Sequence, residues 1–186
     1  MSPGNTGGRL YEQAFEDFLA AEGIPYVPVT IAQRQAFQAA RIKSFDFVVW
    51  PSEGPNWLVD IKGRTANGTG RLENWVTNGD LDGLVQWQEV FGAGYVGMFV
   101  FVFMVDCPSQ WPHQQAPLHQ FQGRSYSFWA MAVDDYRRLA KVRSARWKTY
   151  TIAPDVFRDL AEPVGKWLVP DDVRDPPTFV DGPHGL

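Results

Sequence analysis

Cysteine is almost absent from this chain: only Cys107 occurs among 186 residues. A single cysteine excludes an internal disulfide and is typical of proteins that stay in a reducing compartment. The first residues, MSPGNTGGRLYEQ, also lack the basic start and the apolar core of a signal peptide. These two absences predict a cytoplasmic protein.

Long hydrophobic runs and an excess of positive charge are missing as well. The longest apolar run, Tyr95–Val105, is too short to span a bilayer, so we expect no membrane partner and a buried central strand. The 17 Lys and Arg residues are outnumbered by 21 Asp and Glu residues, with a net charge of −4. This balance argues against a protein that coats nucleic acid by bulk electrostatics. It leaves a nuclease open, because bound divalent cations make a carboxylate site far less negative.

Apolar and aromatic residues are plentiful. Hydrophobic residues make up 45% of the chain and aromatic residues 15%, which excludes a disordered or low-complexity protein. The length suits one well-cored domain. Six of the 17 basic residues gather in one run, for which a solvated helix face and a phosphate-facing surface are both open. They are Arg137, Arg138, Lys141, Arg143, Arg146 and Lys148.

Hydrophobic periodicity predicts helices and strands in alternation. Residues 9–23 form an amphipathic pattern with helical spacing, and residues 44–50 and 56–63 are strands joined by turn residues as a hairpin. The remaining predictions are an extended segment at 24–29, a polar loop at 64–80, helices at 81–92, 134–145 and 154–168, and strands at 95–105, 126–133 and 147–152. This order predicts an α/β fold in which helices flank a mixed central sheet.

Three charged residues lie inside the apolar hairpin strands, namely Asp46, Asp60 and Lys62. Charges in buried strands cost several kcal/mol unless something pairs with them. Asp60 and Lys62 are two apart, so their side chains point to the same face of the sheet.

Whether Asp46 joins them depends on the hairpin register. Asp46 lies opposite Asp60 only if Trp50 lies opposite Asn56, which leaves residues 51–55 as a five-residue loop. A slip of one residue would send Asp46 to the other face.

Two carboxylates beside a lysine suit one class of chemistry. Mg²⁺ and Mn²⁺ prefer hard oxygen ligands and keep several waters, so two or three carboxylates are a sufficient anchor. Such a cation activates water and stabilises charge on a phosphoryl oxygen, and a lysine can hold or help deprotonate the attacking water. The trio therefore favours hydrolysis of a phosphodiester.

Glu12 in the first helix, then SFD, then LVDIKGR resembles the PD-(D/E)xK nuclease superfamily, whose fold is restriction-endonuclease-like. The pattern is most similar to that of Holliday-junction-resolvase-like nucleases. The resemblance matches Glu12 to the helix-one glutamate, Asp46 to the strand aspartate, and Asp60 and Lys62 to the D/E-x-K pair. Phe45 stands where the pattern often has proline.

The resemblance implies a fold, a cofactor and a reaction. It implies an αβββαβ core and one or two Mg²⁺ or Mn²⁺ ions held by Asp46, Asp60, Glu12 and the Ile61 carbonyl group. Lys62 would position the attacking water. The implied reaction is phosphodiester hydrolysis, with DNA as partner and endonucleolytic cleavage, and a homodimer is compatible with it.

Further residues are candidates for contact with nucleic acid. Arg64 follows the motif directly, where a phosphate contact and a plain surface role are both open. Arg71 and Trp75 follow in the loop and can meet a nucleic acid by charge and stacking, although Trp75 as a hydrophobic plug is the favoured alternative. The superfamily's helix glutamine corresponds to Gln86 or Gln88, and Gln88 is a further candidate for contact with nucleic acid.

The predicted organisation is a nuclease-like core at 1–106, a loop insertion at 107–124, a small C-terminal α/β extension at 125–169 packed on the core, and a tail at 170–186. Two rival functions remain. One is a catalytically silent module that uses the fold to bind nucleic acid or a protein. The other is the same metal chemistry acting on RNA or a small nucleotide.

Overall fold

The computed structural model describes residues 6–39, 42–66 and 70–168, and the predicted tail lies outside these ranges. Its helices are α1 (Thr6–Ala21), α2 (Ile31–Ala39), α3 (Asn78–Phe91), α4 (Val133–Leu139), α5 (Pro154–Leu160), α6 (Val164–Leu168) and a short 3₁₀ helix, η1 (Pro108–Gln110). Its strands are β1 (Tyr26–Pro28), β2 (Phe47–Val49), β3 (Asn56–Ala66), β4 (Val76–Thr77), β5 (Tyr95–Val105), β6 (His119–Phe121), β7 (Arg124–Ala132), β8 (Lys141–Ser144), β9 (Thr149–Thr151) and β10 (Glu162–Pro163).

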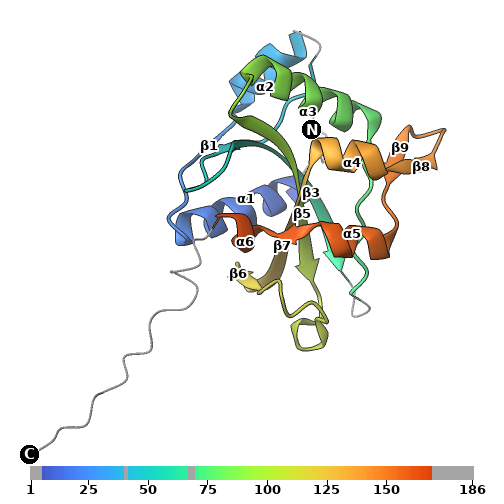
Figure 1. Ribbon diagram of the computed structural model, residues 1–186. Coiled ribbons are helices and arrows are strands. Elements are labelled where there is room, and N and C mark those ends of the chain that lie inside the picture. Colours follow the sequence, from blue (N-terminus) through green and yellow to red (C-terminus); the bar gives the residue numbers. More distant parts are fainter. Residues whose placement is uncertain (1–5, 40–41, 67–69, 169–186) are drawn as a thin grey trace, which may run out of the picture.

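A seven-stranded mixed sheet forms the centre of the molecule (Figure 1). Its order is β1-β2-β3-β5-β7-β10, with β6 pairing on β7, and a separate three-stranded sheet has the order β4-β9-β8. Strands β3 and β5 are parallel along their whole length, and the other pairs are antiparallel. The expected mixed sheet flanked by helices is therefore confirmed.

Each face of the central sheet carries its own apolar core. Helix α1 buries Ala14, Phe15 and Leu19 against one face, together with α6. Helices α3, α4 and α5 cover the other face, where Trp87 and Tyr136 belong to the core. Because both faces are covered, β5 is apolar throughout, as expected of a fully buried strand. No helix in the described ranges combines the length and apolarity needed to cross a membrane.

The paired part of the hairpin has the expected register, but it ends before Asp46. Strands β2 and β3 pair Phe47 with Val59 and Val49 with Trp57. The ladder ends there: the Asp46 backbone N–H donates to the Val59 carbonyl instead of the Asp60 carbonyl. Phe45 and Phe47, on either side of Asp46, belong to the cores on opposite faces, so the alternation that would set Asp46 on the face of Asp60 is broken at Asp46. Strand β3 is longer than predicted, since it runs to Ala66 instead of ending at residue 63. The parallel ladder with β5 holds these extra residues in extended conformation despite their polar character.

Helix α2 is an element that the sequence reading missed. Its N-terminus is a reciprocal cap: the Gln33 backbone N–H donates to the Thr30 hydroxyl, and the Thr30 backbone N–H donates to the Gln33 side chain at 2.8 Å. The Thr-x-x-Gln spacing is the known signature of such a cap. The helix matters below because it carries Arg34.

The C-terminal part also departs from the predicted elements. The helix expected at 134–145 ends at Leu139, and Lys141–Ser144 instead pairs with β9 as strand β8. The helix expected at 154–168 is broken into α5, β10 and α6, since Pro163 lacks the N–H of a helix interior and pairs with β7. Strand β7 pairs with β5 along eight residue pairs, so the segment predicted as an extension packed on the core contributes strands to the central sheet.

Helix α1 lies close to β3 at a glycine. A Cβ added at Gly63 would lie 2.1 Å from Cδ2 of Tyr11, so the tyrosine ring rests directly on the strand backbone. We expect Gly63→Ala to lower the free energy of unfolding by about 1–3 kcal/mol, because the ring and α1 must shift. Urea denaturation measures the change.

Gly79→Ala is the matched control. Its added Cβ would meet nothing closer than 3.8 Å, and alanine favours the helix. A loss of stability in Gly79→Ala as large as that in Gly63→Ala would contradict this account of the close approach.

Candidate active site

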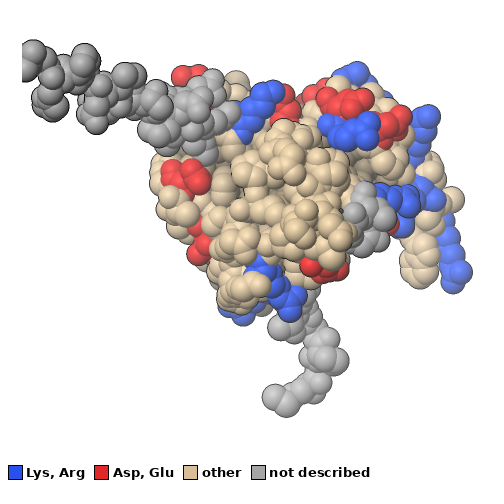
Figure 2. Space-filling view, turned by 90° about the horizontal axis from the view of Figure 1, so that it is seen from below, with Lys and Arg blue, Asp and Glu red and all other residues tan. Residues whose placement is uncertain are grey.

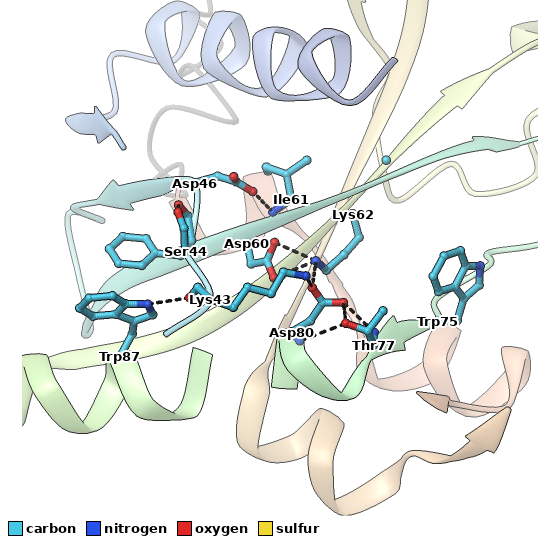
Figure 3. A network of polar contacts seen from close by, with 12 residues as sticks. Lys43, Ser44, Asp46, Asp60, Ile61, Lys62, Trp75, Thr77, Asp80 and Trp87 are labelled. Atoms are coloured by element: carbon cyan, nitrogen blue, oxygen red, sulfur yellow. Dashed lines mark hydrogen bonds and ion pairs between the residues drawn. The ribbon is translucent and has the colours of Figure 1, made fainter. Parts of the chain in front are cut away.

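Asp60 and Lys62 project together from β3 toward the N-terminus of α3 (Figure 3). The Lys62 Nζ lies 2.8 Å from each oxygen of the Asp60 carboxylate and 2.9 Å from Oδ1 of Asp80. Asp60 is only 6% exposed. Lys62 therefore forms a buried ammonium between two carboxylates.

Asp80 is a central residue that the sequence reading missed. It lies in the first turn of α3, where its Oδ2 accepts hydrogen bonds from the Thr77 backbone N–H at 2.6 Å and the Thr77 hydroxyl at 2.7 Å. Its Oδ1 pairs with Lys62 and also with Lys43. Burial would raise the pKa of Asp80, but the two ammonium groups outweigh it and hold that pKa well below its usual range. The Thr-x-x-Asp spacing signals such a cap, yet the helix was predicted to begin one residue after Asp80.

Asp46 directly precedes β2 and lies beside β3. Its backbone N–H donates to the Val59 carbonyl at 2.7 Å, and its carbonyl accepts from the Val29 N–H at 2.8 Å. Its Oδ2 accepts a hydrogen bond from the Ile61 backbone N–H at 2.7 Å (Figure 3). The carboxylate thus takes the position beside Ile61 where a longer β2 would supply a backbone partner. Ile61, whose carbonyl group is predicted as a metal ligand, is thus the residue whose backbone N–H binds the Asp46 carboxylate.

Arg34 of α2 joins Asp46 to Glu12. Its Nη2 lies 2.9 Å from Oδ1 of Asp46 and 3.3 Å from Oε2 of Glu12, and its Nε donates to the Val29 carbonyl at 3.2 Å. Sequence reading missed Arg34 because it missed the helix that carries it. Glu12 and Asp46, predicted to share a metal, share this guanidinium.

The site has more negative charge than its own cations neutralise. Burial raises the pKa of Asp60 to about 7; the neighbouring carboxylates of Asp46 and Asp80 add to this, and Lys62 opposes it. Burial and the charge of Glu12 likewise raise the pKa of Asp46, against the Ile61 hydrogen bond, Arg34 and Lys62. Burial lowers the pKa of Lys62, but the carboxylates of Asp60 and Asp80 together raise it by more. The net shift of the pKa is upward, so Lys62 is an ammonium.

These contacts allow a cation site made of few side chains. Within the described ranges, no group of three or more His, Cys, Asp or Glu side chains is arranged to hold a metal ion. Mg²⁺, however, is often bound through one or two carboxylates and completed by water. Asp46 and Asp60 are buried carboxylates, the hard oxygen donors that such a cation prefers, and the upward direction of their pKa values, which burial causes, agrees with such a site.

The other predicted contacts with nucleic acid lie in different surroundings. Arg64 lies over the ring of Trp75, 4.1 Å from its centroid, and donates to the carbonyl groups of Gly63 and Trp75. Arg71 is exposed. Gln88 uses both ends of its amide within the protein, donating to Asp134 at 2.9 Å and accepting from the Gly97 N–H at 2.8 Å. These bonds give Gln88 a role in joining α3 to β5 and α4, and its contact with nucleic acid stays a prediction.

The fold is similar to a solved structure. Hjc, a Holliday junction resolvase from the archaeal hyperthermophile Archaeoglobus fulgidus, superposes with a TM-score of 0.50 and 12% sequence identity, over 87% of this chain and 94% of that chain. No protein-family model matches the sequence, and no curated protein matches it as a relative. The likeness concerns the fold, and it confirms the restriction-endonuclease-like α/β class predicted from the sequence.

Asp80 should be the strongest contributor to stability in this network. We expect Asp80→Asn to lower the free energy of unfolding at pH 7 by about 3 kcal/mol, since it leaves buried Lys62 with one partner fewer. The pKa of Asp80 is lower in the folded than in the unfolded chain, so its stabilisation is present above the unfolded pKa of about 4 and is lost as the pH falls below it. The difference between wild type and Asp80→Asn should therefore shrink in acid.

Urea denaturation over a series of pH values measures this effect. Asp82→Asn, an exposed carboxylate on the same helix, is the control and should change stability little at any pH. A difference for Asp80→Asn that stays constant from neutral to acidic pH would contradict the ion-pair explanation.

Proposed function

We propose that this protein is a divalent-metal-dependent nuclease that hydrolyses phosphodiester bonds in DNA, with endonucleolytic cleavage. The observation that carries the proposal is the buried Asp60 carboxylate 2.8 Å from the Lys62 ammonium, with a second buried carboxylate, Asp46, accepting a hydrogen bond from the backbone N–H of the intervening residue, Ile61. Ionisable groups perturbed by burial and by specific charged partners are typical of functional sites. The fold shared with a Holliday junction resolvase supports the same function.

The chain's residues have distinct roles in the proposed reaction. Asp46 and Asp60 would hold Mg²⁺ or Mn²⁺, one ion or two, with the Ile61 carbonyl group as a further ligand. A bound divalent cation supplies charge neutralisation for the phosphoryl group and lowers the pKa of water. Lys62 remains an ammonium, so it orients the attacking water or a phosphate oxygen as a hydrogen-bond donor. Glu12 acts through Arg34, which fixes the Asp46 carboxylate.

Replacement of either carboxylate tests the proposal. We expect Asp60→Asn and Asp46→Asn to reduce cleavage of DNA with Mg²⁺ or Mn²⁺ on the order of 100-fold or more, because each removes charge that stabilises the reacting phosphate. A gel assay on duplex, branched and single-stranded DNA, with RNA alongside, measures cleavage and separates the substrate classes. Isothermal calorimetry measures metal binding by the same variants.

The control is Asp82→Asn, which should cleave like the wild type. Thermal unfolding of all variants shows whether a loss of activity is a loss of folding. A wild-type protein that cuts none of these nucleic acids with either metal would contradict the proposed function.

One observation favours a second candidate, a silent module that binds nucleic acid or protein without cutting it. Arg34 already contacts Asp46 at 2.9 Å, and Lys62 contacts both Asp60 and Asp80, so each carboxylate has a cation from the chain. A module of this kind would have no need of a metal.

Arg34→Ala distinguishes the two candidates. For a metal nuclease we expect wild type to bind Mn²⁺ and Arg34→Ala to bind it severalfold more tightly, because the competing guanidinium is gone. Calorimetry measures both affinities, with Arg9→Ala on the exposed surface of α1 as the control. If calorimetry detects heat of Mn²⁺ binding for Arg34→Ala and none for the wild type, the silent module is favoured instead.

A further inference from the structure

A short β-hairpin, formed by β8 and β9, concentrates positive charge in an acidic protein. No Asp or Glu occurs between Asp135 and Asp155, although the whole chain has a net charge of −4. Four exposed cations lie in this hairpin without an ion pair to any other residue that the structure describes; they are Lys141, Arg143, Arg146 and Lys148. Figure 2 shows Lys and Arg side chains gathered at the right-hand margin, the side where Figure 1 places the hairpin.

The tip of this hairpin presents an aromatic ring to solvent. The Trp147 side chain is 69% exposed, more than any other tryptophan that the structure describes. The turn that carries it is structured: the Trp147 N–H donates to the Ser144 hydroxyl at 3.2 Å, and Lys148 adopts a φ of 46°. Arg146 lies 5.1 Å from the Trp147 ring centroid. The indole is thus exposed and fixed by its turn, among cations that form no ion pair with the part of the chain that the structure describes.

A surface pocket of about 580 Å³ lies between the hairpin and the segment before α3. Its lining contains no acidic side chain and consists of Trp75, Thr77, Arg143, Ser144, Trp147 and Thr149. Trp75 forms a firm wall, because Arg64 covers its ring at 4.1 Å and Arg143 lies 5.2 Å from the same ring.

The pocket is connected to the candidate active site through few residues. Strand β9 pairs with β4, so Thr149 lies opposite Thr77, and the Asn78 N–H donates to the Lys148 carbonyl at 2.9 Å. Thr77 in turn binds Asp80, which holds Lys62. On β3, Arg64 follows Lys62 on the same face, and its guanidinium reaches Trp75. In the view of Figure 3, Thr77 lies between Asp80 and Trp75.

We propose that the β8–β9 hairpin binds an unpaired DNA strand, with Trp147 stacking on a base and Arg143 and Arg146 contacting the adjacent phosphates. This rests on the proposed function and assigns to it a substrate class: DNA with a single-stranded segment beside the cleavage point. A base in a duplex has both faces covered by its neighbours, whereas an unpaired base offers a free face to an exposed indole. Unpaired cations supply the affinity for the backbone.

Fluorescence anisotropy of a labelled oligo(dT) strand, in EDTA so that no cleavage occurs, tests the proposal. We expect Trp147→Ala to weaken binding about 10-fold, since base stacking is lost, and Trp147→Phe to retain most of the affinity. The double variant Arg143→Ala/Arg146→Ala should flatten the plot of log affinity against log salt by about 0.7 for each cation removed.

The matched control is Trp167→Ala, which removes an indole that is 48% exposed on α6, away from the hairpin. It should bind the strand like the wild type, and a blunt duplex of equal length should bind more weakly than the single strand. Equal binding by Trp147→Ala and wild type, or a duplex bound as tightly as the single strand, would overturn the proposal.

Failure here and failure of the nuclease proposal give different results. A wild type that binds oligo(dT) through Trp147 but cuts nothing would retire the nuclease proposal and leave the binding site standing. If the wild type cuts DNA and Trp147→Ala binds oligo(dT) with wild-type affinity, the nuclease proposal stands and the proposed binding site is wrong.

Discussion

The buried ammonium of Lys62 is the interaction on which the rest of the site depends. It lies within 2.9 Å of carboxylate oxygens from both Asp60 and Asp80, and so ties the central sheet to the first turn of α3. Asp80 also caps that helix through Thr77, whose strand pairs with β9 of the small sheet. One charge therefore joins three parts of the molecule. A buried charge is stable only while its partners remain, which explains why these parts keep one arrangement.

Charge balance in the candidate active site is incomplete, and this imbalance gives the site its chemical character. Arg34, Lys43 and Lys62 serve four carboxylates, and the pKa values of Asp46 and Asp60 still lie above their usual range. Well-packed apolar residues would be at least as stable as buried charges at these positions. The cost in stability is understandable if the carboxylates serve a cation and a phosphate, and natural proteins often carry such costs at functional sites.

Much of the fold was predictable because it depends on local patterns. The apolar run of β5 indicated a strand covered on both faces, and turn residues between the hairpin strands indicated their pairing. Other elements were decided by pairing that no local pattern encodes. Residues Lys141–Ser144 read as helix but join β9, and Pro163 divides an apparent helix so that a short strand can extend the sheet. Propensity is a weak guide wherever a strand partner from elsewhere in the chain is available.

The sequence by itself determined which charges lie in buried strands. Asp60 and Lys62 share a face because side chains alternate along a strand, and that rule needs no knowledge of the remaining structure. Only the tertiary structure decided which partners those charges have. Arg34 reaches Asp46 from a helix inserted between two strands, and Asp80 reaches Lys62 from a helix cap 18 residues further along the chain. Such contacts depend on how helices pack on the sheet, so composition and periodicity could name the carboxylates but could not supply the cations that hold them.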